Sequence, residues 1–164
     1  MKRKYIKEIC SVGKNILRSD NMQSTKYSIQ HGSTTVFEHC VNVTGTCLAI
    51  ADRFHIQLDR RSLIRGALLH DYFLYDWHAD ERWHRLHGYT HAARALYNAR
   101  REFELNSIEE DMIYSHMFPL NLTHIPHYRE SLILCIADKY CSTLETFSKS
   151  HGRQVRPAAS VNRN

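Results

Sequence analysis

The segment LIRGALLHDYFLYDW, residues 63–77, decides how the rest of the sequence is interpreted. Leu63 and Ala67 are four positions apart in an apolar context, which places them on the buried face of a helix. His70 and Asp71 then stand side by side where the apolar pattern should continue. A buried imidazole or carboxylate is costly unless it is paired or coordinated, so this pair needs a physical reason.

The length and composition of the chain are those of an ordinary globular protein. It has 164 residues, of which 43% are hydrophobic and 24% are charged, and this is long enough to bury a substantial core. We expect one domain over residues 1–150 and a flexible tail over residues 151–164. No apolar run reaches the ~20 residues of a membrane span, and the basic N-terminus lacks the apolar stretch of a secretory signal. These features favour a cytoplasmic protein that does not bind a membrane.

Cysteine usage and net charge narrow the class of function. The odd number of cysteines, with no CxxC pair, is typical of reduced and mostly buried thiols in the cytoplasm: Cys10, Cys40, Cys47, Cys135 and Cys141. The formal net charge of +5 is compatible with a small, phosphate-bearing substrate. Lysines and arginines form no stripe with interleaved aromatics, so the sequence carries no specific nucleic-acid motif.

Helical periodicity runs through most of the chain, and no segment shows the alternation of a strand. The predicted fold is therefore all-α. Helices are expected within residues 6–17, 33–54, 59–71, 88–103, 106–118 and 128–147, with a polar connection over residues 19–25. The candidate N-caps are Ser33 or Thr34, Asp59, Thr90, and Ser107 with Glu110 in a capping box.

Six polar residues interrupt the apolar faces of these helices. Each falls on or next to the face that its helix should bury: His39, His70, Asp71, His91, His116 and Asp138. One such residue is usually a satisfied core group, but six in one chain need a common explanation. Neutral imidazoles and ionised carboxylates that converge between helices are the donor set of a divalent metal site. A metal centre would explain why the His-Asp pair is buried.

The order His39 … His70-Asp71 … Asp138 resembles the HD superfamily of metal-dependent phosphohydrolases. Members of that superfamily are helical domains in which a His, a His-Asp pair and a distal Asp bind a divalent cation. The resemblance extends over about residues 30–142, most of the chain. It implies a compact HD-type helical bundle in which these four residues hold the first metal.

His91 and His116 lie between the His-Asp pair and the distal Asp, as in the expanded HD pattern that binds a second metal. That pattern occurs in HD-GYP cyclic-dinucleotide phosphodiesterases and in HD-type diadenosine-tetraphosphate hydrolases. The resemblance implies that these two histidines help to hold the second ion and that Asp71 bridges both. Met117 stands where HD-GYP proteins continue a tandem His pair, and YFLYDW replaces their glycine- and lysine-bearing segment. These departures argue against cyclic di-GMP as the substrate and leave one or two ions per chain open.

The same resemblance implies hydrolysis of a phosphoester or phosphoanhydride bond, with nucleotides as the substrate class and metal-activated water as the nucleophile. The expected cofactor is Fe, Mn, Co, Mg or Zn, and the His-rich second site favours a transition metal. Asp71 and Lys139 are the predicted catalytic residues, with the lysine steadying a phosphate oxygen or a carboxylate. Arg82, Arg85 and Arg94 are candidates for binding the substrate's phosphate.

Three other interpretations account for the same residues. The first is a non-catalytic HD domain that binds metal or nucleotide together with a protein partner. The second is a di-iron oxygenase of the HD type, which needs six ligands together with contacts to an organic substrate. In the third, the polar residues are ordinary core and helix-end groups and the protein only binds others. A separate alternative concerns His91 alone, which would be a helix-start residue rather than a ligand.

Overall fold

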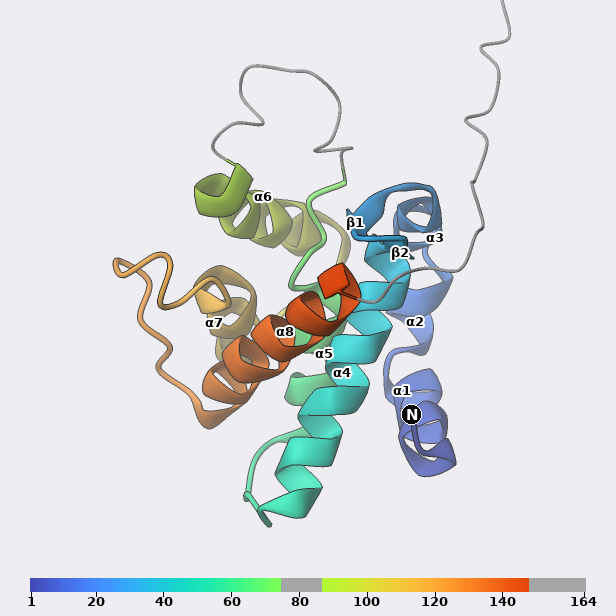
Figure 1. The fold of residues 1–164 in the computed structure, drawn as a ribbon, viewed down its shortest axis with the longest axis vertical. Helices are drawn as coiled ribbons and strands as arrows, with labels where there is room; N and C mark the ends of the chain where they lie inside the picture. Colours follow the sequence, from blue (N-terminus) through green and yellow to red (C-terminus); the bar gives the residue numbers. More distant parts are fainter. Residues whose placement is uncertain (75–86, 148–164) are drawn as a thin grey trace, which may run out of the picture.

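The computed structural model describes residues 1–74 and 87–147, and these residues are almost entirely helical (Figure 1). The elements in chain order are α1 (Arg3–Val12), α2 (Lys14–Arg18), α3 (Asp20–Ser24), the 3-10 turn η1 (Thr25–Tyr27), β1 (Ile29–His31), β2 (Thr34–Thr35), α4 (Val36–Arg53), α5 (Arg60–Leu69), α6 (His87–Glu102), α7 (Ser107–Ser115) and α8 (Arg129–Phe147). Helices α4 and α8 lie side by side in the middle of the molecule, and α5 packs against both. The first three helices lie beyond α4, and α6 and α7 lie on the opposite side of the molecule (Figure 1). The all-α prediction is confirmed.

Two short helices, α1 and α2, take the place of the single helix expected over residues 6–17. Gly13 separates α1 from α2, and a side chain at this position would collide with Leu68 of α5. The chain therefore comes close to the core at the break. Ser19 caps α3 by accepting a hydrogen bond from a first-turn backbone N–H at 3.3 Å, so the polar connection expected over residues 19–25 is helical as well.

A small antiparallel hairpin, β1 paired with β2, precedes α4. The sequence did not predict it, because strands of two and three residues are too short to display an alternating pattern. Gly32 forms its turn with a φ of +59°, a conformation that glycine adopts at little cost. A Cβ at Gly32 would lie 2.6 Å from the carbonyl oxygen of Glu145. The turn therefore lies directly against the C-terminal end of α8.

Helix α4 begins with a capping box one or two residues after the predicted caps. Thr35 Oγ1 accepts from the backbone N–H of Glu38 at 3.2 Å, and the Glu38 carboxylate accepts from the backbone N–H of Thr35 at 3.0 Å. Ser33 and Thr34, the residues predicted from the sequence, belong to the hairpin turn and to β2. Their prediction as caps is wrong because the strand pairing extends up to the helix.

Two further N-termini show how closely cap residues can be placed from sequence. Asp59 caps α5 as predicted, with its carboxylate accepting from a first-turn N–H at 3.0 Å. The capping box of α7 is formed by Asn106 and Glu109 rather than by Ser107 and Glu110. The prediction was one residue late, since both registers place a polar cap three residues before a glutamate.

Helix α6 begins at His87, so Thr90, which was predicted as its cap, lies inside its first turn. From the middle of α6, the side-chain amide of Asn98 donates to the backbone carbonyls of Tyr72 and Phe73 at 3.0 and 2.9 Å. These bonds fix the chain immediately after the His-Asp pair. Helix α6 thus fixes a segment 25 or more residues earlier in the sequence.

The core lies where α4, α5, α7 and α8 meet, and it includes Leu48, Leu63, Met112 and Leu134 with no exposed surface. Four of the five cysteines are buried as predicted, Cys10 is exposed, and no disulfide joins the cysteines of the described residues. Within the described ranges, no helix combines the length and apolar character that crossing a membrane requires. Arg82, Arg85 and the predicted tail over residues 151–164 lie outside the described residues.

Candidate metal centre

The six residues predicted as metal ligands lie close together between five helices. His39 comes from α4, His70 and Asp71 directly follow α5, His91 comes from α6, His116 directly follows α7, and Asp138 comes from α8. None exposes more than 7% of its surface. Polar groups contributed by five separate helices are thus gathered at one buried point of the bundle.

The first cluster consists of His39, His70 and Asp138, whose ligand atoms all lie within 4.8 Å of one another. The Nε2 atom of His39 is 3.1 Å from Oδ1 of Asp138, and the Nε2 atom of His70 is 3.7 Å from the same oxygen. Two imidazole nitrogens and one carboxylate oxygen therefore face a common centre.

The second cluster consists of Asp71, His91 and His116, again with ligand atoms within 4.8 Å of one another. The Nε2 atoms of His91 and His116 are 2.9 Å apart. They lie 3.4 and 3.5 Å from Oδ1 of Asp71. This cluster has the same composition as the first, two imidazoles and one carboxylate.

Asp71 lies between the two clusters. While its Oδ1 atom faces the second cluster, its Oδ2 atom is 3.7 Å from Nε2 of His39 and 3.5 Å from Nε2 of His70. One carboxylate thus presents one oxygen to each cluster. This is the position that a bridging ligand requires.

Hydrogen bonds on the outer side of the rings fix which nitrogen faces the centre. His70 and His116 each bond through Nδ1 to the backbone carbonyl three residues earlier in the chain, at 2.8 and 2.7 Å. His39 bonds through Nδ1 to Oε2 of Glu145 at 2.6 Å. Because an acceptor on Nδ1 keeps the proton there in the neutral ring, the Nε2 lone pair is directed inward.

Both carboxylates of the site are ionised. Burial favours the neutral acid, but the surrounding imidazoles of His70, His91, His116 and His39 outweigh it and hold the pKa of Asp71 below its ordinary value. The pKa of Asp138 is likewise far below its ordinary value, since hydrogen bonds from histidines overcome the effect of burial. Ionised carboxylates are the form that binds a divalent cation.

The pKa values of two histidines in the site shift in opposite directions. Burial disfavours the charged ring of His39, yet its contacts with Asp138 and Glu145 raise its pKa to about 10. Burial and the neighbouring rings of His91 and His70 lower the pKa of His116 to about 3. Without a cation, a proton on His39 balances part of the carboxylate charge, and a bound cation would replace that proton.

Two observations test whether these residues fit metal ions. Among the described residues, His70 Nε2 and Asp71 Oδ1 are buried without a hydrogen-bond partner, which is rare in folded proteins unless a ligand supplies the contact. Donor atoms held at about 2.1 Å from one cation lie roughly 3.0–3.4 Å apart at octahedral or tetrahedral angles. The separations within both clusters are close to that range. The donor set therefore fits one divalent cation in each cluster.

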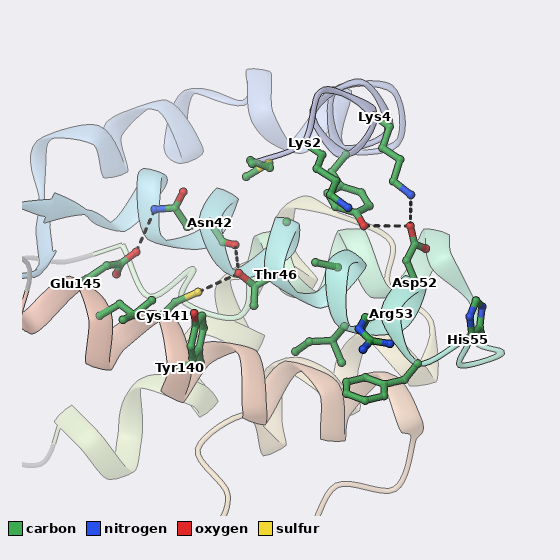
Figure 2. A pocket seen from close by; sticks show the side chains of 17 residues that line it. Lys2, Lys4, Asn42, Thr46, Asp52, Arg53, His55, Tyr140, Cys141 and Glu145 are labelled. Atoms are coloured by element: carbon green, nitrogen blue, oxygen red, sulfur yellow. Dashed lines mark hydrogen bonds and ion pairs between the residues drawn. The ribbon is translucent and has the colours of Figure 1, made fainter.

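Two residues that support the site were missed from the sequence. Gln30, on β1, donates from Nε2 to Oδ2 of Asp71 at 2.5 Å, and its Oε1 atom is buried without a partner among the described residues. Glu145, near the end of α8, forms a hydrogen bond through Oε2 with Nδ1 of His39. Its Oε1 atom accepts a hydrogen bond from the side-chain amide of Asn42 at 3.1 Å. Figure 2 shows Asn42 and Glu145 facing each other across α4 and α8. Neither residue interrupts an apolar pattern, so periodicity gives no signal for them.

The predicted catalytic and substrate-binding residues differ in how close they lie to the clusters. Lys139 is beside the first cluster, where Nζ donates to the backbone carbonyl of His116 at 2.5 Å and to Oδ2 of Asp138 at 3.3 Å. Arg94 is exposed on α6, one turn after His91. The other two predicted arginines lie outside the described residues.

Comparison with known proteins identifies one family. The family model described as the HD domain matches residues 36–143, a range that includes all six clustered residues. Neither the curated proteins nor the solved structures contain a match to this chain. Because the matched range covers well over half of the sequence and its buried histidines and aspartates fit the metal site of that family, the chain belongs to the HD domain family, whose members are generally metal-dependent phosphohydrolases.

Proposed function

We propose that this protein hydrolyses a phosphoester or phosphoanhydride bond of a nucleotide with the help of two divalent cations. The position of Asp71 carries the proposal, because each of its oxygens faces a separate cluster of two histidines. A bridging carboxylate between two clusters is typical of two-metal hydrolytic sites.

The two cations would be held by different parts of the site. His39, His70, Asp138 and Oδ2 of Asp71 would hold the first, and Oδ1 of Asp71 with His91 and His116 would hold the second. When bound, divalent cations acidify water to provide a nucleophile near neutral pH and stabilise negative charge on a phosphoryl group. Imidazole donors favour Fe, Mn, Co or Zn over Mg.

The residues of the chain would supply orientation and charge. Glu145 and the backbone carbonyls hold the imidazoles from outside, so the ligands need little rearrangement when an ion binds. Lys139 has three N–H donors, two of which are used by described residues, and 39% of its side-chain surface is exposed. Its third donor is available to a phosphate oxygen, which is the role we propose for it.

Support for a nucleotide substrate comes from charge and family. The net charge of +5 favours an anionic ligand, and Arg94 places one cation on the helix that carries His91. We retain Arg82 and Arg85 as further candidates for phosphate binding. Five cysteines without a disulfide among the described residues agree with action in the reducing cytoplasm.

The first experiment is elemental analysis of tag-free protein purified without chelator, together with His91→Ala. We expect about two transition-metal ions per wild-type chain and about one in the variant, because the variant loses a donor of the second cluster only. His124→Ala is the matched control, since His124 is a loop histidine outside both clusters. Phosphate release from a panel of nucleotides then tests the activity and should be lost in His91→Ala.

Other outcomes would change the proposal in defined ways. One ion in both proteins would indicate a mononuclear hydrolase. The absence of metal after reconstitution with Mn and Fe would rule out the catalytic proposal and leave a non-catalytic helical domain. Oxygen consumption with a visible iron absorption band, but without phosphate release, would indicate a di-iron oxygenase.

A further inference from the structure

The outward face of α8 carries a stripe of large apolar side chains. Leu132, Ile136, Tyr140 and Leu144 recur every four residues and expose 48%, 61%, 57% and 52% of their surfaces. Phe147, at the end of the helix, exposes 80%. Side chains four residues apart lie on one face of a helix, so these five residues form a continuous ridge, here named the α8 ridge. Among the described residues, nothing covers it.

Helix α8 is apolar on its outward face as well as on its buried face. A helix at the surface of a globular protein normally turns its apolar face inward and its polar face to water. In α8 the inward face packs Ile133 and Leu134 into the core and also carries Asp138 of the first cluster, which accepts a hydrogen bond from Ser142 Oγ at 3.2 Å. The outward face carries the large apolar groups. Contiguous apolar surface of this kind marks an interaction site.

A groove adjoins the ridge on one side. It has a volume of about 1090 Å³ and lies between α4 and α8, reaching the start of α1. Figure 2 shows Tyr140 on the α8 wall of this groove and Thr46 on the α4 wall. Ile50 and Phe54 of the α4 side also line it, and Phe54 exposes 68% of its surface. The apolar surface therefore continues from the ridge onto the end of α4.

The amount of exposed apolar surface matches what one partner gives to a stable dimer. An aromatic side chain carries about 150–250 Å², so the exposed fractions of Phe54, Tyr140 and Phe147 together with the three aliphatic residues supply roughly 700–800 Å². A specific interface of standard size takes about 800 Å² from each partner. We infer that α8 packs against α8 of a second copy of this chain, with the α8 ridge as the centre of a symmetric dimer interface.

The spacing of the ridge favours a second copy over other partners. A ridge built from residues four apart packs into the groove beside the same kind of ridge, with the helices crossing at about −50°. The α8 ridge is therefore complementary to itself, as a two-fold interface requires. An anionic membrane or a nucleic acid would need a row of cations without opposing charge, but the groove beside the ridge is lined by both cations and carboxylates: Lys2, Lys4, Arg53, Asp52 and Glu145.

The two-fold axis fixes which residues meet. With the two α8 helices antiparallel and crossing at the middle of the ridge, Ile136 of one chain faces Tyr140 of the other, and the reverse contact forms by symmetry. A charge at either position would then be buried against an apolar residue in the homodimer. Opposite charges at the two positions would face each other only in a mixed dimer.

The test is the mass of the full-length, metal-loaded protein in solution, measured by sedimentation at several concentrations. We expect about twice the 19.3 kDa chain mass for the wild type, and the single-chain mass for both Ile136→Glu and Tyr140→Lys. Mixing the two variants should restore the dimer. Ile6→Glu is the matched control, because Ile6 is an isoleucine of α1 with 47% of its surface exposed and it should stay dimeric.

The proposal is overturned if the wild type remains at the single-chain mass up to about 100 µM, well above the dissociation constant of a specific dimer. It is also overturned if Ile136→Glu stays dimeric, or if mixing the two variants does not restore the dimer. Melting temperature and metal content are measured on every variant. A single-chain mass counts in favour of the dimer only when both values equal those of the wild type, which shows that the fold is intact.

Discussion

Glu145 lies behind His39, on the side of the ring away from the other ligands, and bonds to its Nδ1 atom at 2.6 Å. Backbone carbonyls do the same for His70 and His116. Those carbonyls come with the helix ends on which the two rings sit, whereas His39 lies inside α4, where the carbonyls are occupied by the helix itself. A side chain must therefore supply the outer hydrogen bond, and it comes from the neighbouring helix.

We predict that Glu145→Ala lowers the affinity of the first site for its metal by about 10–100-fold, the usual effect of removing an outer partner of a ligating histidine. Glu145→Gln should lose less of this metal affinity, because its amide oxygen can still accept a hydrogen bond from Nδ1 of His39. The measurement is competition for Mn²⁺ or Zn²⁺ against a fluorescent chelator. Glu104→Ala, a change at an exposed residue outside both clusters, is the control and should bind as the wild type does. Unchanged affinity in Glu145→Ala would refute the positioning role.

A second residue-scale prediction concerns pH. Burial favours the neutral form of Asp111, but hydrogen bonds from Ser131 Oγ at 2.5 Å and from His127 Nδ1 at 2.8 Å outweigh it and hold its pKa below the ordinary 3.8. A lowered carboxyl pKa stabilises the folded chain above the unfolded pKa and loses that effect as the pH falls through the folded value. Asp111→Asn should therefore be less stable than the wild type at pH 6.

The difference in the free energy of unfolding between the wild type and Asp111→Asn should shrink as the pH falls below about 4. Urea unfolding of metal-stripped protein across this range measures the free energy of unfolding of both proteins, with the metal removed so that pH-dependent metal binding does not contribute. A difference that stays constant down to pH 3 would contradict the assignment of Asp111.

The residue scale also shows what the sequence could and could not predict about the site. The six clustered residues were found because each interrupts an apolar helical face, which is a visible conflict between burial and polarity. Gln30 and Glu145 produce no such conflict. Gln30 lies in a hairpin that has no periodic signal, and Glu145 follows the polar sequence of a helix end. Their roles depend on contacts across 41 and 106 positions of the chain.

At the scale of elements, the close approach of α5 and α7 brings two ligands together. A Cβ on Gly66 would lie 2.6 Å from the sulfur of Met112, whose side chain is fully buried. The same two helices end at His70 and His116, whose rings are 5.0 Å apart. Gly66 therefore permits the close spacing of α5 and α7 that brings His70 of the first cluster next to His116 of the second.

We predict that Gly66→Ala destabilises the protein by about 1–3 kcal/mol, as overpacking of a filled core does, and weakens metal binding. The matched control is Gly45→Ala in α4. A Cβ there would also meet a methionine, but this is Met1, which exposes 56% of its surface and can move away. Alanine should then be neutral or stabilising through its better helix propensity. Denaturant unfolding measures the free energy of unfolding of both variants. An equal decrease in the two would contradict the packing argument.

Element boundaries explain most of the remaining differences from the sequence predictions. The helices exist where periodicity placed them, but their N-termini differ from the predicted caps: Thr35 and Asn106 are caps one or two residues away from the predicted ones, and α6 begins at His87, before the predicted cap Thr90. Several adjacent residues in these segments have side chains that can accept a hydrogen bond from the first turn. Pairing of β2 and packing against neighbouring helices select among them, and neither is visible in a local window of sequence.

At the scale of the whole molecule, the centre joins parts of the chain that are distant in sequence. The first cluster connects residues 99 positions apart, and the second connects helices that precede and follow α6. Resemblance to a known pattern predicted both these residues and their division around Asp71, whereas helical periodicity indicated only that each interrupts a buried face. That division depends on the packing of five helices at once, which no local pattern encodes.

The last prediction follows from that arrangement. Each cation would bind donors brought together only in the folded chain, so metal binding should stabilise the fold by about 2.7 kcal/mol when the free metal is at 100 times its dissociation constant. Removing the metal with a chelator should lower the melting temperature by roughly 5–10 °C for a chain of this size, and adding Mn²⁺ should restore it. Asp71→Asn should respond much less, because the variant loses the carboxylate that faces both clusters. Equal melting temperatures with and without metal in the wild type would show that the buried histidines and aspartates are satisfied by one another alone.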